Sequence, residues 1–257
     1  MTSLSKHVYT GDGEDKISSL PEALLLHILS LMPTHYAVRT SILSLRWKDL
    51  WALVPSLDFE WMSSNTVDNN DLSFVNFVDH VLLHKLTSIE RISFYVRGPD
   101  SEVVASCLHE WLRVAIRCHV QVIYIQMCPF PPLSLPSELF TCKTLTRLQL
   151  ARELEFDTPL SSVWLPNLRD LQGLDFADDN KLPLFPNLIR LNLIVPDDYS
   201  WRLLPDLLCS APNLATLVLW KCVEKGVNRL FPFNSRGKEQ LPGEGSTVPK
   251  GFKDLPN

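Results

Sequence analysis

The spacing most suggestive of chemistry belongs to His80 and His84, four residues apart in the stretch HVLLH. On a helix this spacing places both imidazoles on one face, which is how helical zinc sites begin. The stretch lacks the glutamate of the H-E-x-x-H motif, and a zinc site needs a third protein ligand. The favoured interpretation is a solvated pair of helix side chains, and no metal is expected.

Cysteine and carboxylate patterns give no stronger signal. The six cysteines are Cys107, Cys118, Cys128, Cys142, Cys209 and Cys222. They form no C-x-x-C pair, so we interpret them as buried apolar residues of a reducing compartment. The acidic pairs Asp178-Asp179 and Asp197-Asp198 lack EF-hand spacing and are expected in solvated loops.

The sequence contains no G-x-S-x-G, Walker or G-x-G-x-x-G motif, so we expect no catalytic residue, no cofactor and no enzyme. A net charge of −5 argues against nucleic-acid binding, which favours a basic surface. No apolar run is long enough to span a membrane, and the first 16 residues lack the apolar region of a secretory signal. We therefore expect a protein of the cytoplasm and/or nucleus that works by binding.

A binding protein needs elements that hold its contact residues in place, and the first such elements are expected in SSLPEALLLHILSLMPTHY. This stretch combines helix-capping residues, prolines that bound helices and apolar residues at helical spacing. Ser19 and Glu22 have the spacing of a capping box, and the pattern predicts a helix that ends near Met32, before Pro33. Thr34 is expected to cap the next helical segment. Two apolar stripes follow this periodicity: Leu24, Leu25, Ile28, Leu29 and Met32, then Val38, Leu43, Trp47, Leu50, Trp51 and Val54.

About 40 residues of short helices cannot hide this much apolar surface in a core of their own, because domains of that size are marginal alone. The stripes leave two alternatives. The spare surface packs on the rest of the chain, or it binds another protein.

The segment from Asp15 to Phe59 resembles an F-box, specifically that of the large plant group of F-box proteins with leucine-rich repeats, including the FBD-like members. The match is carried by Leu20-Pro21, Ile28-Leu29, Val38-Arg39-Thr40, Leu43-Ser44, Arg46-Trp47 and Leu50-Trp51. Leu45 departs from the pattern, since relatives usually carry lysine there. This resemblance implies contact with a Skp-type adaptor and, through it, a cullin. The residues it implies for adaptor binding are Leu20, Pro21, Ile28, Leu29, Val38, Leu43, Trp47, Leu50 and Trp51.

Beyond residue 65 a helix-then-strand order recurs, first in LSFVNFVDHVLLHKL and IERISFYV and then in SEVVASCLHEWLRVAIRCHVQVIYIQM. The first of these helices is expected to share one apolar face from Phe74 to Leu86. The pattern L-x-x-L-x-L starts at Ile89, Val120, Leu145, Leu168, Leu188 and Leu214. Most of these starts are separated by the 20–29 residues of a leucine-rich repeat, and the copy at Leu168 is degraded because Gly173 takes its last position. In the last three copies the first leucine is preceded by Pro-Asn, which gives the tripeptides Pro166-Asn167-Leu168, Pro186-Asn187-Leu188 and Pro212-Asn213-Leu214.

The resemblance and these patterns together predict an α/β fold: an all-α F-box module, as the resemblance implies, followed by a leucine-rich-repeat solenoid with a parallel sheet. The expected domains are a disordered tail at 1–15, the F-box at 16–62, the repeats at 63–222 and a mostly disordered tail at 223–257. A generic α/β domain with leucine-rich strands is the alternative. Relatives usually continue with further repeats, so the chain is expected to be short at its carboxyl end.

Residues between the core leucines should form ladders on the outward face of the sheet. The three predicted ladders are Arg91, Val122, Arg147, Asp170, Arg190 and Thr216; Ser93, Tyr124, Gln149, Gln172, Asn192 and Val218; and Tyr95, Gln126, Ala151, Leu174, Ile194 and Trp220. Aromatic and arginine side chains are common interface anchors, so Tyr95, Tyr124, Arg147, Arg190 and Trp220 are the candidate contacts for an acidic or phosphorylated target. Ordinary variation of exposed strand residues is the alternative.

The resemblance implies the substrate-recognition subunit of a Skp–cullin–F-box ubiquitin ligase, which docks by the F-box and selects a target by the repeats. Two alternatives stay open: a truncated F-box protein that binds the adaptor without a degradation substrate, and an enzyme of unknown type built on the repeat region.

Overall fold

A computed structural model describes residues 17, 19–62, 71–98, 101–128, 135–150, 165–174, 184–195 and 204–221. The two predicted tails and the acidic pairs at 178–179 and 197–198 lie outside the described residues. No helix in the described ranges is both long and apolar enough to cross a membrane.

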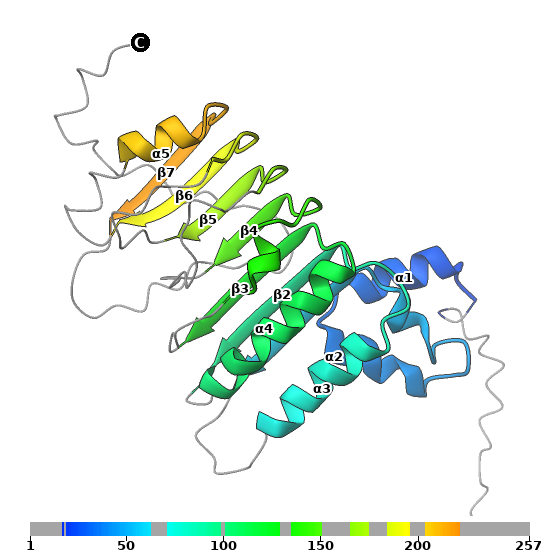
Figure 1. The fold of residues 1–257 in the computed structure, drawn as a ribbon. Coiled ribbons are helices and arrows are strands. Elements are labelled where there is room, and N and C mark those ends of the chain that lie inside the picture. Colours follow the sequence, from blue (N-terminus) through cyan, green and yellow to red (C-terminus); the bar gives the residue numbers. More distant parts are fainter. Residues whose placement is uncertain are drawn as a thin grey trace, which may run out of the picture. The chain divides into compact units, whose positions relative to one another are not determined.

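Short helices precede a parallel sheet whose strands lie side by side in chain order, β1 to β7 (Figure 1). The helices are α1 (Glu22–Ser30), α2 (Thr34–Arg39), η1 (Thr40–Ile42), η2 (Leu50–Leu53), α3 (Asp71–Leu83), α4 (Ser101–Arg117), η3 (Ser137–Leu139) and α5 (Leu204–Ser210). The strands are β1 (Ser56–Met62), β2 (Arg91–Arg97), β3 (Val122–Cys128), β4 (Arg147–Leu150), β5 (Asp170–Leu174), β6 (Arg190–Val195) and β7 (Thr216–Lys221). A sheet of neighbouring parallel strands, each from one repeat, confirms the predicted α/β architecture.

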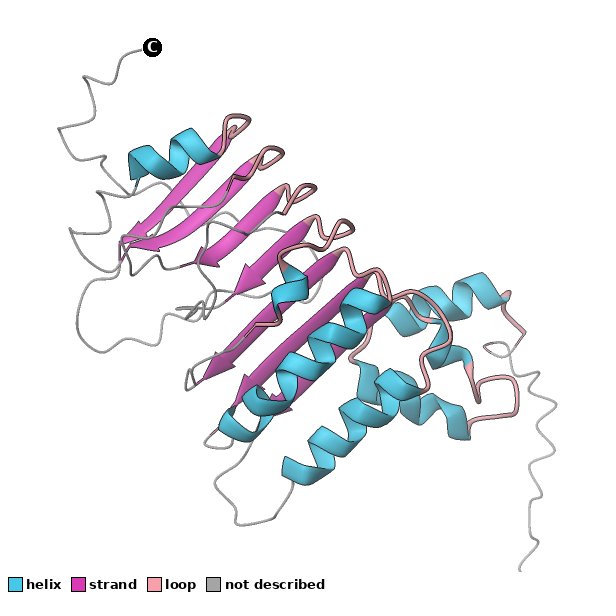
Figure 2. Ribbon diagram, viewed as in Figure 1, coloured by secondary structure: helices cyan, strands magenta, loops and turns pink. Residues whose placement is uncertain are grey.

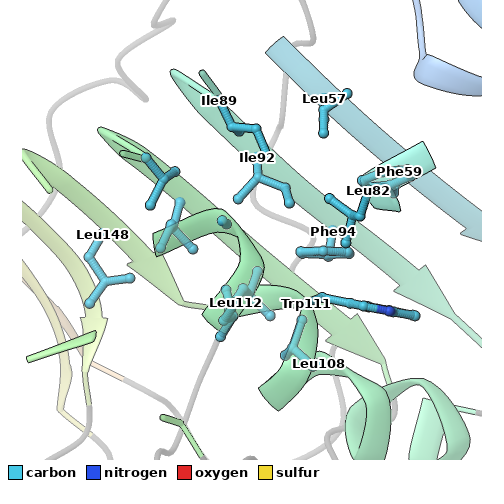
Figure 3. Close-up of a cluster of buried hydrophobic side chains, with 14 of the residues drawn as sticks. Leu57, Phe59, Leu82, Ile89, Ile92, Phe94, Leu108, Trp111, Leu112 and Leu148 are labelled. Carbon is cyan, nitrogen blue, oxygen red and sulfur yellow. The ribbon is translucent and has the colours of Figure 1, made fainter. Parts of the chain in front are cut away.

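The apolar residues of the leucine-rich pattern lie in the core of the sheet, as predicted. Ile92, Ile123, Leu148 and Leu171 are buried and lie in register across adjacent strands. Figure 3 shows part of this core, where Leu108, Trp111 and Leu112 of α4 point toward Ile92 and Phe94 of the sheet. Because no single repeat encloses its own leucines, the repeats stabilise one another through this shared core.

The sheet begins one strand earlier than the repeat pattern predicts. Val54, Leu57 and Phe59 repeat the L-x-x-L-x-L spacing, and all three are buried. Leu57 pairs with Ile92 and Phe59 with Phe94 across the β1–β2 ladder. The copy is hidden in the sequence because the same residues, VPSLDF, belong to the F-box resemblance. The segment that resembles an F-box therefore runs directly into the first strand of the repeat sheet.

Helices α3 and α4 cover one face of the first strands (Figure 2). The ring of Phe94 stacks between the rings of Phe59 and Trp111, with centroids 5.4 Å from each. Trp111 Nε1 donates a hydrogen bond to Asp79 Oδ1 at 2.7 Å, which ties α4 to α3. The predicted apolar face of α3 is wrong at Leu86, since the helix ends at Leu83 and Leu86 is exposed.

The Pro-Asn-Leu segments have a structural role that repeats along the sheet. Asn167, Asn187 and Asn213 each donate a side-chain amide hydrogen bond to a backbone carbonyl of the preceding repeat, that of Lys143, Pro166 and Pro186 respectively. Thr144 makes the corresponding bond to the carbonyl of Val120 at 2.7 Å. These bonds satisfy carbonyls in the tight turns that enter each strand, and this explains why the tripeptide recurs.

The degraded repeat position at Gly173 is a bulge. Gln172 pairs with Asn192, but the next pairing joins Leu174 to Leu193, so Gly173 is left out of the register. The third predicted ladder is therefore wrong in its register at Leu174, which pairs with Leu193 and not with Ile194. Gly173 has φ +82°, and a Cβ atom there would lie 1.5 Å from the carbonyl oxygen of Leu150. Glycine is required at this position because only glycine allows both the backbone conformation and the close approach.

Three smaller expectations are corrected. Helix α1 begins at Glu22 with Pro21 in the N-cap position and no cap from its side chain, so the predicted capping box is wrong, and the helix stops at Ser30. Thr34 does not cap α2, whose N-cap residue is Pro33. Cys209 is exposed, whereas the cysteines were expected to be buried. Short helices packed on a sheet derive their ends from tertiary contacts more than from capping signals.

Candidate functional site

The residues predicted for adaptor binding divide into three groups by exposure. Pro21, Ile28 and Leu43 are exposed, Leu20 and Val38 are partly buried, and Leu29, Trp47, Leu50 and Trp51 are buried. The buried four share one continuous core with Val54, Leu57 and the sheet. They shape the module, and the exposed residues are the ones placed to contact another protein.

Several exposed apolar side chains in the same module were missed as candidates. The full exposed apolar set is Ile17, Leu24, Ile28, Leu31, Tyr36, Ile42, Leu43 and Leu45. Leu45 is 91% exposed and Ile42 is 85% exposed. The first sequence alternative is therefore confirmed in part, because the module packs part of its apolar surface on the sheet and leaves the rest uncovered. The binding of another protein to the uncovered part stays a prediction. A helical stripe alone cannot show this division, because α1 presents Leu25 and Leu29 inward but Leu24 and Ile28 outward.

The F-box module is joined to the sheet by specific hydrogen bonds. The backbone N–H of Asp58 in β1 donates to Thr34 Oγ1 at 2.7 Å, which satisfies a donor on the edge strand. Lys85 Nζ donates to the carbonyls of Ala52 and Val54, at 2.9 and 2.5 Å, and to Thr87 Oγ1 at 2.9 Å. Burial lowers the pKa of Lys85 to about 8, opposed by the nearby Cys118 thiol. These contacts hold the module against the first repeat.

The second surface is the face of the sheet opposite its core, called here the outer sheet face. It is formed by the residues that alternate with the core positions. Three of the five candidate contacts meet on it through Asp170: Arg147 Nε lies 3.2 Å and Arg190 Nη1 3.3 Å from Asp170 Oδ2. Arg147 Nη1 also donates to the Tyr124 hydroxyl at 3.1 Å. Gln172 Nε2 donates to Asp170 Oδ1 at 3.2 Å.

We call these five residues, Tyr124, Arg147, Asp170, Gln172 and Arg190, the arginine cluster. The Asp170 side chain is only 6% exposed, whereas both arginine side chains are 40% exposed. The positive groups therefore face solvent and the carboxylate lies beneath them. Asp170 was not singled out from the sequence, although the order Arg147, Asp170, Arg190 on adjacent strands is the signal of a cross-strand ion-pair row.

The other two candidate contacts do not join this cluster. The Tyr95 hydroxyl accepts a hydrogen bond from Arg97 Nη2 at 2.6 Å, and the Arg97 guanidinium lies 5.5 Å from the centre of the Tyr95 ring. Trp220 is in backbone register with Ile194, but its side chain lies outside the described part of the structure.

A row of amides runs beside the ion pairs. Gln149, Gln172 and Asn192 are in register on β4, β5 and β6, and all three are partly buried. Asn192 Oδ1 is buried, and no donor reaches it within the described ranges. Buried polar atoms normally have a partner, so this acceptor distinguishes the row from ordinary strand residues.

Asp58 lies in the same outward row as Tyr124 and Gln149, at the β1 end. Burial raises the pKa of Asp58 to about 6 from 3.8; the Glu60 carboxylate adds to the shift and Arg91 opposes it. The folded protein therefore binds this proton more tightly than the unfolded chain. The stability that protonation contributes is complete below about pH 4 and is lost as the pH rises through about 6.

Asp58→Asn should consequently stabilise the protein at pH 7.5 by about 1–2 kcal/mol, after allowance for partial solvent screening. The gain should vanish at pH 4, where the wild-type carboxyl is largely protonated in the folded state. Urea unfolding between pH 4 and 8 measures the difference, with the exposed Asp49→Asn as the matched control. A gain from Asp58→Asn that stays constant with pH would contradict the assignment.

The histidine pair shows no sign of a metal centre. His80 and His84 are exposed, their rings lie 4.0 Å apart, and His84 Nδ1 is 2.8 Å from the carbonyl oxygen of His80. No group of three or more potential ligands occurs in the parts of the chain that the structure covers.

Comparison with known proteins identifies the helical module and finds relatives that also cover most of the repeat region. The F-box domain family matches residues 17–58. A putative F-box/FBD/LRR-repeat protein of Arabidopsis thaliana is 35% identical over 65% of this chain and 39% of its own length. An F-box/FBD/LRR-repeat protein of that plant is 32% identical over 80% of this chain and 49% of its own. An FBD-associated F-box protein is 33% identical, covering 80% and 50%. The chain thus spans between 39% and 50% of the length of these relatives.

Proposed function

We propose that this chain, an F-box protein with leucine-rich repeats similar to those of plants, is the substrate-recognition subunit of a Skp–cullin–F-box ubiquitin ligase. F-box proteins of this type generally act in such complexes. The observation that carries the proposal is the exposed apolar set within residues 17–45, on a module whose F-box match ends at residue 58 in strand β1. Adaptor helices would cover that set, and the outer sheet face would bind the target.

The chain's contribution to the reaction is placement. A ligase subunit of this kind performs no bond chemistry; it holds a target near the ubiquitin-carrying enzyme and so raises the effective concentration of the target lysines. The hydrogen bonds of Thr34 and Lys85 suit this role, because they tie the docking module to the recognition sheet. The proposed place of action is the cytoplasm and/or nucleus.

The test is reconstitution. The full chain is co-expressed with a plant Skp-type adaptor, and the purified complex is added to a cullin, a RING protein and charged ubiquitin-carrying enzyme. Formation of a stoichiometric complex that joins the cullin supports the proposal. A chain that fails to bind the adaptor refutes it, and a complex that joins the cullin but never modifies any captured protein favours the form without a degradation substrate.

Solubility gives a simpler prediction. Exposed apolar surface on a protein promotes association, so the chain expressed alone should be poorly soluble and co-expression with the adaptor should raise its soluble yield several-fold. Size-exclusion chromatography with light scattering measures both states. If the lone chain is a monomer at high concentration, residues 17–45 do not form an unsatisfied interface and the adaptor proposal loses its main support.

A further inference from the structure

A short segment joins the F-box module to the repeat sheet. Helix η2 ends at Leu53, Val54 has an extended conformation, and strand β1 begins at Ser56. The carbonyl groups at the end of a helix have no partner within that helix, so a chain that passes here from helix to strand needs donors from elsewhere. This segment is the place at which the module would pivot on the sheet if nothing held it.

The donors come from the residues that follow α3. Every carbonyl group of residues 52–54 accepts a hydrogen bond from residues 85–87, and the bonds are Lys85 Nζ to Ala52 O (2.9 Å), Lys85 Nζ to Val54 O (2.5 Å), Leu86 N–H to Ala52 O (3.3 Å) and the Thr87 hydroxyl to Leu53 O (3.3 Å). The Thr87 hydroxyl also accepts a hydrogen bond from Lys85 Nζ at 2.9 Å. We call this set of bonds the Lys85 clamp.

Lys85 is the centre of the clamp because its ammonium group has three protons and three acceptors. Burial lowers the pKa of Lys85 to about 8, so the side chain is mainly charged at pH 7, and a charged donor makes a stronger hydrogen bond than a neutral one. Apolar packing is non-directional, whereas a hydrogen bond weakens steeply as its angle departs from linear. The clamp therefore fixes an angle between module and sheet that the shared core alone leaves adjustable.

This angle matters because the two binding surfaces lie apart. The F-box match ends in β1, and six further strands follow β1 across the sheet. At about 4.8 Å per strand, β7 lies about 29 Å from β1, so a pivot of about 10° would displace a target held near β7 by about 5 Å. A misplacement of about 1 Å between reacting groups can already cost about 100-fold in rate.

We propose that Lys85 is a positioning residue for ubiquitin transfer: by holding the carbonyl groups of residues 52–54, it sets the orientation of the repeat sheet relative to the docking module and so determines which lysines of a bound target are modified. This inference rests on the proposed function, because it assigns Lys85 a role within that reaction.

The test uses a peptide ruler in place of a target. A proline-rich peptide with a lysine at every fourth position is joined by click chemistry to an azide-bearing residue that replaces Thr216, an exposed residue of β7 on the outer sheet face. Proline-rich chains are stiff and extend by about 3.1 Å per residue, so successive lysines lie about 12 Å apart. The full chain is assembled with adaptor, cullin and RING protein, and mass spectrometry gives the rate of ubiquitin transfer to each lysine.

Lys85→Met keeps an apolar stem of similar length but removes the charge and all three donors. In the wild type we expect transfer to concentrate on one or two neighbouring lysines of the ruler. In Lys85→Met the rate at the favoured lysine should fall about tenfold and the modified lysines should spread along the ruler, because the module can now pivot. Lys85→Arg keeps a charged donor and should restore most of the wild-type pattern.

Lys143→Met is the matched control, because Lys143 is an exposed lysine of the repeats, and it should leave both rate and pattern unchanged. Thr87→Val is a milder second variant that removes the bond to Leu53 and one acceptor of Lys85, and it should spread the modified lysines less than Lys85→Met does. Adaptor affinity should stay within about twofold in every variant. Thermal melting of each complex reports whether it is folded.

The pattern of modified lysines separates positioning from general stability, since a chain that is only destabilised loses rate equally at every lysine. An unchanged pattern in Lys85→Met overturns the inference, whether or not the rates fall. If Lys85→Met does not fold, Thr87→Val decides by the same criterion. A wild-type complex that modifies no lysine of the ruler overturns the proposed function together with this inference, whereas wild-type transfer with an unchanged pattern in the variants overturns this inference alone.

Discussion

Ile28→Asp combined with Leu43→Asp should weaken binding to a Skp-type adaptor by at least about 100-fold, since single apolar anchors of an interface are commonly worth about 2 kcal/mol or more. Ile28 is 36% exposed on α1 and Leu43 is 63% exposed just after η1. An aspartate at either position would force a charge into the interface of the complex. In the free chain Leu43 lies mostly in water, whereas a large part of the Ile28 side chain is buried, so the double variant should lose about 1–2 kcal/mol of folding stability and should still fold.

The control for this double variant is Leu83→Asp, because Leu83 is an exposed leucine on α3, outside the F-box match. Its adaptor affinity should stay within about twofold of wild type, since surface changes away from an interface have small effects. Calorimetric titration or biolayer interferometry with purified adaptor measures both affinities. Wild-type affinity in the double variant would mean that the adaptor contacts another surface.

Substitution of the buried residues in the predicted adaptor-binding set would not show whether they contact the adaptor. Trp51 and Leu29 belong to the core, and truncation to alanine typically costs about 2–5 kcal/mol of folding stability. Loss of adaptor binding in Trp51→Ala would therefore report unfolding. The family resemblance identified the right module, but only burial separates the residues that shape it from those that are placed to touch a partner.

The repeat sheet was more predictable than the surfaces it carries. Inward positions follow a period of two that apolar residues must obey, so Ile92, Leu148 and Leu171 could be placed from the sequence. Outward positions obey no such rule. The ladder order did place Arg147, Asp170 and Arg190 on adjacent strands, yet the enclosure of Asp170 depends on how the long neighbouring side chains lie.

The structure differs from the sequence prediction at the first repeat copy and at Gly173. In both places one stretch of sequence has a structural role that the repeat pattern alone does not reveal. Val54, Leu57 and Phe59 lie in the segment that resembles an F-box, and in the structure they also form the first copy of the repeat pattern. The repeat pattern treats Gly173 as a lost leucine, but Gly173 forms a bulge after which Leu174 pairs with Leu193. Sequence period alone cannot reveal a bulge, because the need for one arises from how closely β4 approaches β5.

Gly173→Ala should be the most damaging methyl addition in the repeat sheet. The added Cβ would lie 1.5 Å from the Leu150 carbonyl oxygen, and that atom is backbone, so no side-chain rotation relieves the clash. The φ of +82° adds about 1–2 kcal/mol for any residue with a Cβ. The bulge must open or β4 must move, and either change disturbs the pairing of β4 with β5 and of β5 with β6.

We expect Gly173→Ala to lower stability by at least about 3 kcal/mol, or about 6–12 °C in melting temperature for a domain of this size. Hydrogen exchange of the adaptor-bound protein should show the largest loss of protection in β4, β5 and β6. Gln149→Ala is the matched control, since it removes an outward side chain from the neighbouring strand and should cost about 1 kcal/mol or less. If Gly173→Ala melts with the wild type, β4 and β5 do not approach as closely as the bulge requires, and Gly173 is a lost leucine after all.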